Sequence, residues 1–179
     1  MGKTLLLTGH PGSGKTTIIR KVIDVLGKRA GGFYTEEISG PGGRKGFRLV
    51  TLAGDEVVLA HKDLRGPKVP RVGRYGVDMS ALEEVGVAAL RQAGREKDII
   101  VVDEIGKMEL LSNDFQVAVM EAIFGPKIVL GTILSKPNPQ ADLYKTLAPV
   151  TLWEVQRRDR DELPERVLTW LQEVGVLPA

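Results

Sequence analysis

The stretch GHPGSGKTT, residues 9–17, follows the apolar run Leu5-Leu6-Leu7 and precedes Ile18-Ile19. Its spacing is typical of a phosphate-binding loop (P-loop): a glycine, four residues, then Gly-Lys-Thr, between a strand-like segment and a helix-like one. The glycines let successive backbone N–H groups point inward and form a nest for an anion. A helix that begins near Lys15 adds its unpaired N–H groups and the positive end of its dipole. The stretch therefore predicts that the ligand is a nucleoside triphosphate.

Three side chains of this loop have distinct predicted roles. Lys15 is expected to reach the β- and γ-phosphates, and the Thr16 hydroxyl to take one position on Mg²⁺. Thr17 is well placed for the α-phosphate, and because it is not a glycine, a GxGxxG dinucleotide fingerprint starting at Gly12 fails. The predicted nucleotide-binding residues of the loop are Gly9, His10, Pro11, Gly12, Ser13, Gly14, Lys15, Thr16 and Thr17.

Composition places further bounds on the chain. With 179 residues, 42% of them hydrophobic, the length suits one domain, residues 1–179, with a substantial core. The net charge of +2 does not require a nucleic-acid partner, although it permits one. Cysteine is absent, so disulfides and thiolate metal sites are excluded. Neither a membrane-spanning run nor a signal peptide is apparent. We expect a cytoplasmic protein, working as a monomer.

The order of predicted elements indicates an α/β fold with a mostly parallel central sheet flanked by helices. Residues 3–8 form a short apolar run suited to a buried parallel strand, and a helix with apolar residues at helical spacing follows. After a strand-like segment at 31–38, the runs 47–52 and 56–60 flank Ala53-Gly54-Asp55 as in a hairpin. We expect this antiparallel hairpin at one edge of the sheet.

Residues 61–76 form a basic segment in which two prolines oppose helix formation. One interpretation is a solvated surface loop. The other is a flap that faces the triphosphate or a weak nucleic-acid patch. The residues alone leave both open.

The second half of the chain continues the alternation of helices and strands. Ser80 and Glu83 resemble a capping box that opens a helix ending near Gly94. Asn113 is the expected cap of a second helix. The remaining predicted elements are a strand at 99–102, a rigid loop at 136–140, a strand at 150–155 and a C-terminal helix from about 163 to 174.

Four aliphatic residues, 99–102, end in Asp103-Glu104. An acid at the carboxyl end of a buried parallel strand lies where α/β sheets bind ligands, and downstream of a P-loop this is the Walker B pattern. Asp103 is expected to hold Mg²⁺, through water, since that ion keeps several waters. Glu104 is placed to orient and polarise a water that attacks the γ-phosphate, which implies hydrolysis.

Several further segments resemble the THEP family of nucleoside-triphosphatases, the small thermophilic and cancer-related enzymes. The matching segments cover most of the chain in the same order: GHPGSGKTT at 9–17, GFYTEEI at 32–38, GRKGFRLVTL at 43–52, VGRYGVDMSALEEVG at 72–86, DEIGKME at 103–109 and RDELP at 160–164. The resemblance implies a RecA-like P-loop core, in which the strand 128–132 lies between the P-loop strand and the Walker B strand.

The same resemblance suggests roles for residues outside the two motifs. Thr132, at a strand end, is a candidate γ-phosphate sensor, or a threonine that simply favours a strand. Lys107 is a candidate catalytic cation, or a solvated loop lysine. Arg160 is a candidate contact for the base or a phosphate, or the charged flank of a helix. Glu109 is expected to be a structural carboxylate.

The sequence as a whole predicts Mg²⁺-dependent hydrolysis of nucleoside triphosphates, slow and tolerant of the base. The predicted catalytic residues are Lys15, Glu104 and Lys107, and the predicted metal-binding residues are Thr16 and Asp103. One alternative is a nucleotide or metabolite kinase with a second, acceptor pocket. Another is a nucleic-acid-coupled switch driven by triphosphate binding.

Overall fold

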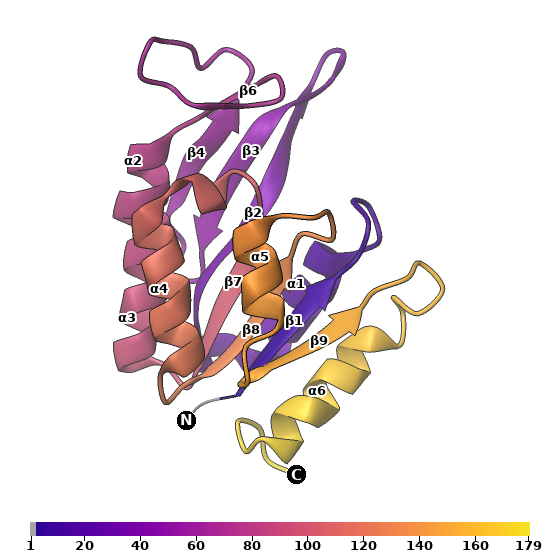
Figure 1. Ribbon diagram of the computed structural model, residues 1–179. Coiled ribbons are helices and arrows are strands. Elements are labelled where there is room, and N and C mark those ends of the chain that lie inside the picture. Colours follow the sequence, from indigo (N-terminus) through magenta and orange to yellow (C-terminus); the bar gives the residue numbers. More distant parts are fainter. Residues whose placement is uncertain (1–2) are drawn as a thin grey trace.

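The computed structural model describes residues 3–179, which form a nine-stranded mixed sheet in the order β5-β6-β4-β3-β2-β7-β8-β1-β9 (Figure 1). The strands are β1 (Thr4–Thr8), β2 (Ala30–Gly40), β3 (Gly43–Thr51), β4 (Glu56–His61), β5 (Arg71–Val72), β6 (Tyr75–Val77), β7 (Ile99–Ile105), β8 (Ile128–Ile133) and β9 (Val150–Glu154). From β2 to β9 in this order, neighbours pair in parallel; from β2 to β5 they pair antiparallel. The predicted α/β fold with an antiparallel edge is confirmed.

Helices cover both faces of this sheet (Figure 1). The buried side chains of α1 (Lys15–Leu26) and α6 (Leu163–Glu173) form one apolar cluster with β1. Those of α3 (Ala88–Glu96), α4 (Asn113–Phe124) and α5 (Pro139–Lys145) belong to a second cluster on the opposite face. Four short helical stretches complete the fold: η1 (Gly27–Arg29), α2 (Met79–Ala81), the π-helical η2 (Leu82–Val87) and η3 (Glu109–Leu111).

The central strands explain where ligands can bind. All of β1 is buried, as are most residues of β7 and β8, which fits strands covered by helices on both faces. Strand β8 lies between β7 and β1, as the family resemblance implies. Because these strands are parallel, their carboxyl ends meet at one edge of the sheet. The loop after β1, the Asp103-Glu104 pair in β7 and Thr132 in β8 therefore converge there.

Two helix caps differ from the sequence prediction. Asp78, not Ser80, caps α2, because its carboxylate accepts a hydrogen bond of 2.9 Å from the Ala81 N–H. Ser112, not Asn113, caps α4, since its hydroxyl accepts a hydrogen bond of 3.1 Å from the Phe115 N–H. In both cases a good capping residue lies one or two positions before the predicted one.

Two segments predicted as loops contain regular structure. The predicted rigid loop 136–140 runs into α5, with Pro139 in its first turn and Asn138 as its cap. The basic segment 61–76 ends in the small β5–β6 hairpin. There the Arg71 guanidinium donates hydrogen bonds to the carbonyl groups of Leu64 and Arg74, so it holds the segment together.

Candidate nucleotide site

The P-loop lies between β1 and α1, and its glycines are required by the surrounding backbone. A Cβ on Gly9 would lie 2.6 Å from the carbonyl oxygen of Val155, which is closer than any side chain allows. Gly14, at the N-cap of α1, has a φ of 104°, a left-handed conformation that favours glycine. These two positions explain the first and last glycines of the motif.

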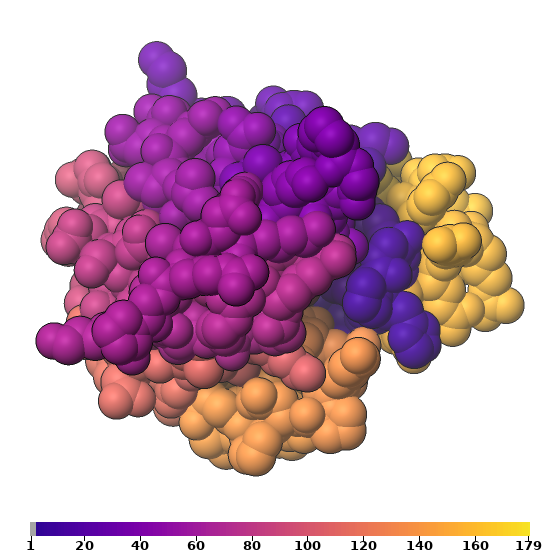
Figure 2. Space-filling model, turned by 90° about the horizontal axis from the view of Figure 1, so that it is seen from above, coloured from indigo at the N-terminus to yellow at the C-terminus, as the bar shows by residue number. Residues whose placement is uncertain are grey.

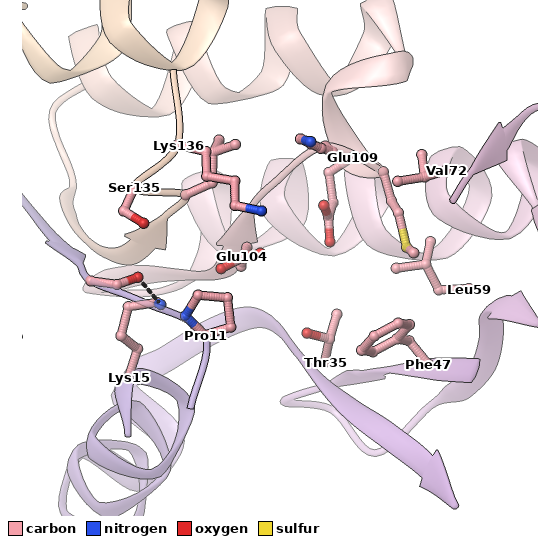
Figure 3. Close-up of a pocket in the computed structure, with 14 residues that line it drawn as sticks. Pro11, Lys15, Thr35, Phe47, Leu59, Val72, Glu104, Glu109, Ser135 and Lys136 are labelled. Carbon is pink, nitrogen blue, oxygen red and sulfur yellow. Dashed lines mark hydrogen bonds between the residues drawn. The ribbon is translucent and has the colours of Figure 1, made fainter. Parts of the chain in front are cut away.

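Lys15 folds back over its own loop. Its ammonium group donates hydrogen bonds of 2.7 Å to the Gly9 carbonyl and 3.3 Å to the His10 carbonyl. The first of these is drawn in Figure 3. The Ser13 hydroxyl lies inside the loop, buried and without a hydrogen-bond partner among the described residues. The loop thus keeps a cation and an unused hydroxyl at the place where the motif predicts phosphates.

Asp103, on β7, is hydrogen-bonded to β8 and to the first turn of α1 at this edge. One of its carboxylate oxygens accepts a hydrogen bond of 2.9 Å from the Thr16 hydroxyl, and the other accepts one of 2.5 Å from the Thr132 hydroxyl. Burial raises the pKa of Asp103, and these hydrogen bonds and the charge of Lys15 oppose the rise. Thr132 is fully buried, so in this structure its hydroxyl orients Asp103.

Glu104 follows Asp103 but lines the open pocket instead of the core (Figure 3). Burial raises the pKa of its carboxyl group, the neighbouring Asp103 charge raises it further, and Lys15 opposes both. A raised pKa brings a carboxylate closer to the proton affinity that suits a general base at neutral pH. The geometry therefore gives the two adjacent acids different surroundings.

A third carboxyl group, Glu109, lies against Glu104, and its proximity was not predicted from the sequence. A Cβ on Gly106 would lie 2.6 Å from one oxygen of Glu104 and 2.9 Å from one oxygen of Glu109, so both side chains use the space that Gly106 leaves free. Burial, followed by the charge of Glu104, raises the pKa of Glu109 to about 8. Glu109 is therefore mostly protonated at neutral pH.

One pocket of about 280 Å³ is lined by Glu104 and Glu109 and by three lysines. Lys107 and Lys136 are both exposed and line this pocket together with Lys15 and Glu104. In the view onto the carboxyl edge, the molecule is hollowed where the indigo P-loop meets the pink-orange and purple segments (Figure 2). The structure thus brings Lys107 to the pocket of Lys15 and Glu104, together with Lys136, which was not predicted from the sequence.

Arg160 lies on the other side of the P-loop. A Cβ on Gly14 would lie 3.5 Å from the Arg160 side chain, and Arg160 lines a separate hollow with Thr17 and Lys21. The two predicted contacts at this end, Thr17 and Arg160, are therefore neighbours. They are separated by the loop from the pocket that contains Glu104.

The donor set near Thr16 suits Mg²⁺. A hydroxyl and a carboxylate oxygen, 2.9 Å apart, are the hard oxygen ligands that this ion prefers, and it completes its shell with water and substrate phosphates. Within residues 3–179, no three His, Asp or Glu side chains form a metal-binding group of their own. The arrangement therefore fits a cation that arrives with the triphosphate.

Comparisons with known proteins give a family match and several similar relatives. A family model described as NTPase matches residues 4–168. The nucleoside-triphosphatase THEP1 of Thermotoga sp. (strain RQ2) is 44% identical over 94% of this chain and 95% of the relative. This chain belongs to the THEP1 nucleoside-triphosphatase family. The human cancer-related nucleoside-triphosphatase is 38% identical over 96% of this chain and 98% of its own.

Solved THEP1-family structures have the same fold. The crystal structure of THEP1 from Aquifex aeolicus superposes with a TM-score of 0.86, at 36% identity, over 94% of this chain and 99% of that one. The solution structure of a human cancer-related nucleoside triphosphatase gives a TM-score of 0.82, at 37% identity, over 96% and 98%. None of the helices within residues 3–179 is long and apolar enough to cross a membrane.

Proposed function

We propose that this chain hydrolyses nucleoside 5′-triphosphates, with Mg²⁺, to the diphosphate and inorganic phosphate. The observation that carries the proposal is the placement of Glu104 in the pocket that Lys15 also lines, directly after the buried Asp103. A carboxylate with a raised pKa next to the phosphate-binding lysine can take a proton from an attacking water.

In this proposal the P-loop holds the phosphates. The backbone N–H groups of residues 9–14 and the first turn of α1 bind the β-phosphate, and Thr17 binds the α-phosphate. Lys15 exchanges its hydrogen bonds with the Gly9 and His10 carbonyls for the β- and γ-phosphate oxygens. The chain of phosphates then runs from the Thr17 side of the loop towards Glu104.

The catalytic step depends on two acids with separate tasks. Glu104 orients the attacking water and accepts its proton. Thr16 and Asp103 would hold Mg²⁺, which supplies positive charge to the β- and γ-phosphate oxygens when it is bound. Thr132 fixes the orientation of Asp103 through the hydrogen bond between them.

We propose Lys107 as the cation that meets charge developing on the transferred phosphoryl group, with Lys136 lining the same pocket. A supplied arginine finger accelerates related enzymes by ~10³ to 10⁵. Arg160 lies on the opposite side of the P-loop, next to Thr17, so we assign it to the base or α-phosphate. Basal turnover is therefore expected to be slow.

The direct test is phosphate release from ATP by the purified protein with Mg²⁺ and no other substrate. A hydrolase releases phosphate steadily, whereas a kinase without its acceptor releases very little. Lys15→Ala is expected to abolish the activity because the β- and γ-phosphates lose their cation, while Lys3→Ala, exposed just before β1, is expected to leave it unchanged. Equal activity in Lys15→Ala and the wild type would contradict the proposal.

A further inference from the structure

The pocket that contains Glu104 extends beyond the P-loop residues to an apolar end. At one end it is lined by the P-loop residues Gly9, Pro11 and Lys15. At the other end it is lined by apolar side chains from three antiparallel strands and from the turn after β7: Phe47, Leu59, Val72 and Met108. We call this second end the apolar recess. In Figure 3, Glu104 lies between Lys15 and the labelled recess residues.

The nucleotide itself has no group for this recess. Phosphates are charged and strongly hydrated, so an apolar wall would weaken their binding. The base lies at the opposite end of the triphosphate, and the hollow beside Thr17 and Arg160 is at that end of the P-loop. The recess therefore suits a second molecule better than it suits the nucleotide.

The chemistry of the walls indicates the class of this molecule. Phe47, Val72 and Met108 are only partly buried, so their apolar surfaces remain available for contact. The polar groups next to them include the Thr35 hydroxyl, beside Phe47, and the carboxyl groups of Glu104 and Glu109 (Figure 3). At about 280 Å³ for the whole pocket, the space is at the lower limit for an organic ligand. A small, neutral molecule with an apolar body and a hydroxyl group fits these walls.

We propose that the apolar recess binds a small alcohol whose hydroxyl group takes the position of the attacking water at Glu104. This inference rests on the proposed function, since it uses the same triphosphate and the same base. The hydroxyl oxygen forms a bond to the γ-phosphorus, and the bond between that phosphorus and the bridging oxygen to the β-phosphate breaks. The hydroxyl proton goes to Glu104, and the bridging oxygen leaves with its electron pair on the diphosphate. The products are a nucleoside diphosphate and a phosphomonoester.

The lysines of the pocket suit this product. Lys107 and Lys136 line the same pocket as Glu104, and both are exposed. Figure 3 shows the Lys136 side chain extending over the space beside Glu104. A phosphoryl group that moves from the P-loop end towards the recess would stay within a field of positive charge.

The test measures how the γ-phosphoryl group divides between water and an alcohol. The purified protein is incubated with ATP, Mg²⁺ and either benzyl alcohol, 2-phenylethanol or 1-hexanol at increasing concentration. ADP and inorganic phosphate are quantified, and ³¹P NMR detects any phosphomonoester. With at least one of the three alcohols, we expect more ADP than inorganic phosphate. This excess should rise to a plateau as the alcohol concentration increases, and the missing phosphate should appear as the phosphomonoester. Equal amounts of ADP and phosphate with all three would overturn the proposal.

A pair of tryptophan variants checks that the alcohol reacts from within the apolar recess. Val72→Trp places a large side chain in the recess from the short β5 strand, and we expect ADP and phosphate to become equal again. Val58→Trp is the matched control, because Val58 is 48% exposed on β4 and does not line the pocket. An undiminished excess of ADP in Val72→Trp would overturn the assignment. Failure of the proposed function looks different, since no ADP would form even without alcohol.

Discussion

Glu104 and Glu109 are two carboxyl groups that share the space above Gly106. Because their charges interact, they are expected to titrate as a pair, in which one group holds its proton more tightly than the other. Glu109 is the more deeply buried of the two, and its pKa of about 8 keeps it mostly protonated at neutral pH. A protonated Glu109 reduces the negative charge gathered beside Asp103 and Glu104.

The first prediction at the residue scale concerns Glu109 and the pH dependence of stability. Its folded pKa is about 8 against an ordinary value of 4.5, so between these values the folded protein keeps a proton that the unfolded chain has released. The free energy of unfolding therefore falls as pH rises through this window. Glu109→Gln removes the titrating group, so its free energy of unfolding should not fall in this way. Relative to the wild type, we expect the variant to become more stable between pH 5 and pH 8, by an amount on the order of a few kcal/mol.

The measurement is the thermal midpoint of both proteins, followed by circular dichroism across this pH range. Glu84→Gln is the control, because Glu84 is exposed on η2, and its midpoint should run parallel to that of the wild type. A constant difference between Glu109→Gln and the wild type from pH 5 to pH 8 would show that Glu109 does not hold its proton as described.

At the scale of single elements, a test at the N-terminus of α2 distinguishes two candidate caps, Asp78 and Ser80. Asp78→Ala removes the carboxylate that accepts the Ala81 N–H, and we expect it to lower the free energy of unfolding by about 1 kcal/mol. Ser80→Ala is the matched control, since Ser80 is exposed and already within the helix, and it should change stability by less than about 0.5 kcal/mol. Urea denaturation of both variants checks this, and the reverse order of effects would restore Ser80 as the cap.

The wrong predictions concern the ends of helices, where several neighbouring residues are equally good caps. Asp78 and Ser80, like Ser112 and Asn113, are all good caps, and only the backbone path decides which side chain reaches a free N–H. The rigid loop predicted at 136–140 overlaps the start of α5, because Pro137 and Pro139 favoured a loop. Pro139 in fact occupies the first turn, where its missing N–H costs nothing.

The strong patterns predicted the central strands correctly, and the family resemblance supplied their order. Buried parallel strands leave continuous aliphatic runs, and the P-loop and Asp103 mark the carboxyl ends of two of them. The β5–β6 hairpin has too few residues for a recognisable alternation. Glu109 begins η3 in a segment that looks like an ordinary solvated turn, so its burial against Glu104 depends on tertiary packing and had no local signal.

At the scale of the whole molecule, the second core cluster connects α4 with the centre of the sheet. Phe115 is fully buried, and its ring lies 6.4 Å from that of Phe33 on β2. We expect Phe115→Ala to lower the free energy of unfolding by about 3 to 5 kcal/mol, because it leaves a cavity between helix and sheet.

Phe124, on the same helix, is 47% exposed and provides the control. Phe124→Ala should cost less than about 1 kcal/mol because the ring loses little buried area. Guanidinium denaturation of the three proteins measures both effects. Similar midpoints for the two variants would contradict the assignment of Phe115 to the core.

The central claim is that Glu104 activates the nucleophile in a site whose phosphate binding depends on other residues. The most direct measurement compares Glu104→Gln with the wild type in two assays. The first measures binding of a non-hydrolysable triphosphate by titration calorimetry. The second measures phosphate release from ATP in the presence of Mg²⁺. Glutamine keeps the size of the side chain but cannot accept the proton at neutral pH. We predict unchanged or tighter binding and a loss of turnover of about 10² to 10⁴. Wild-type turnover in Glu104→Gln would contradict the account.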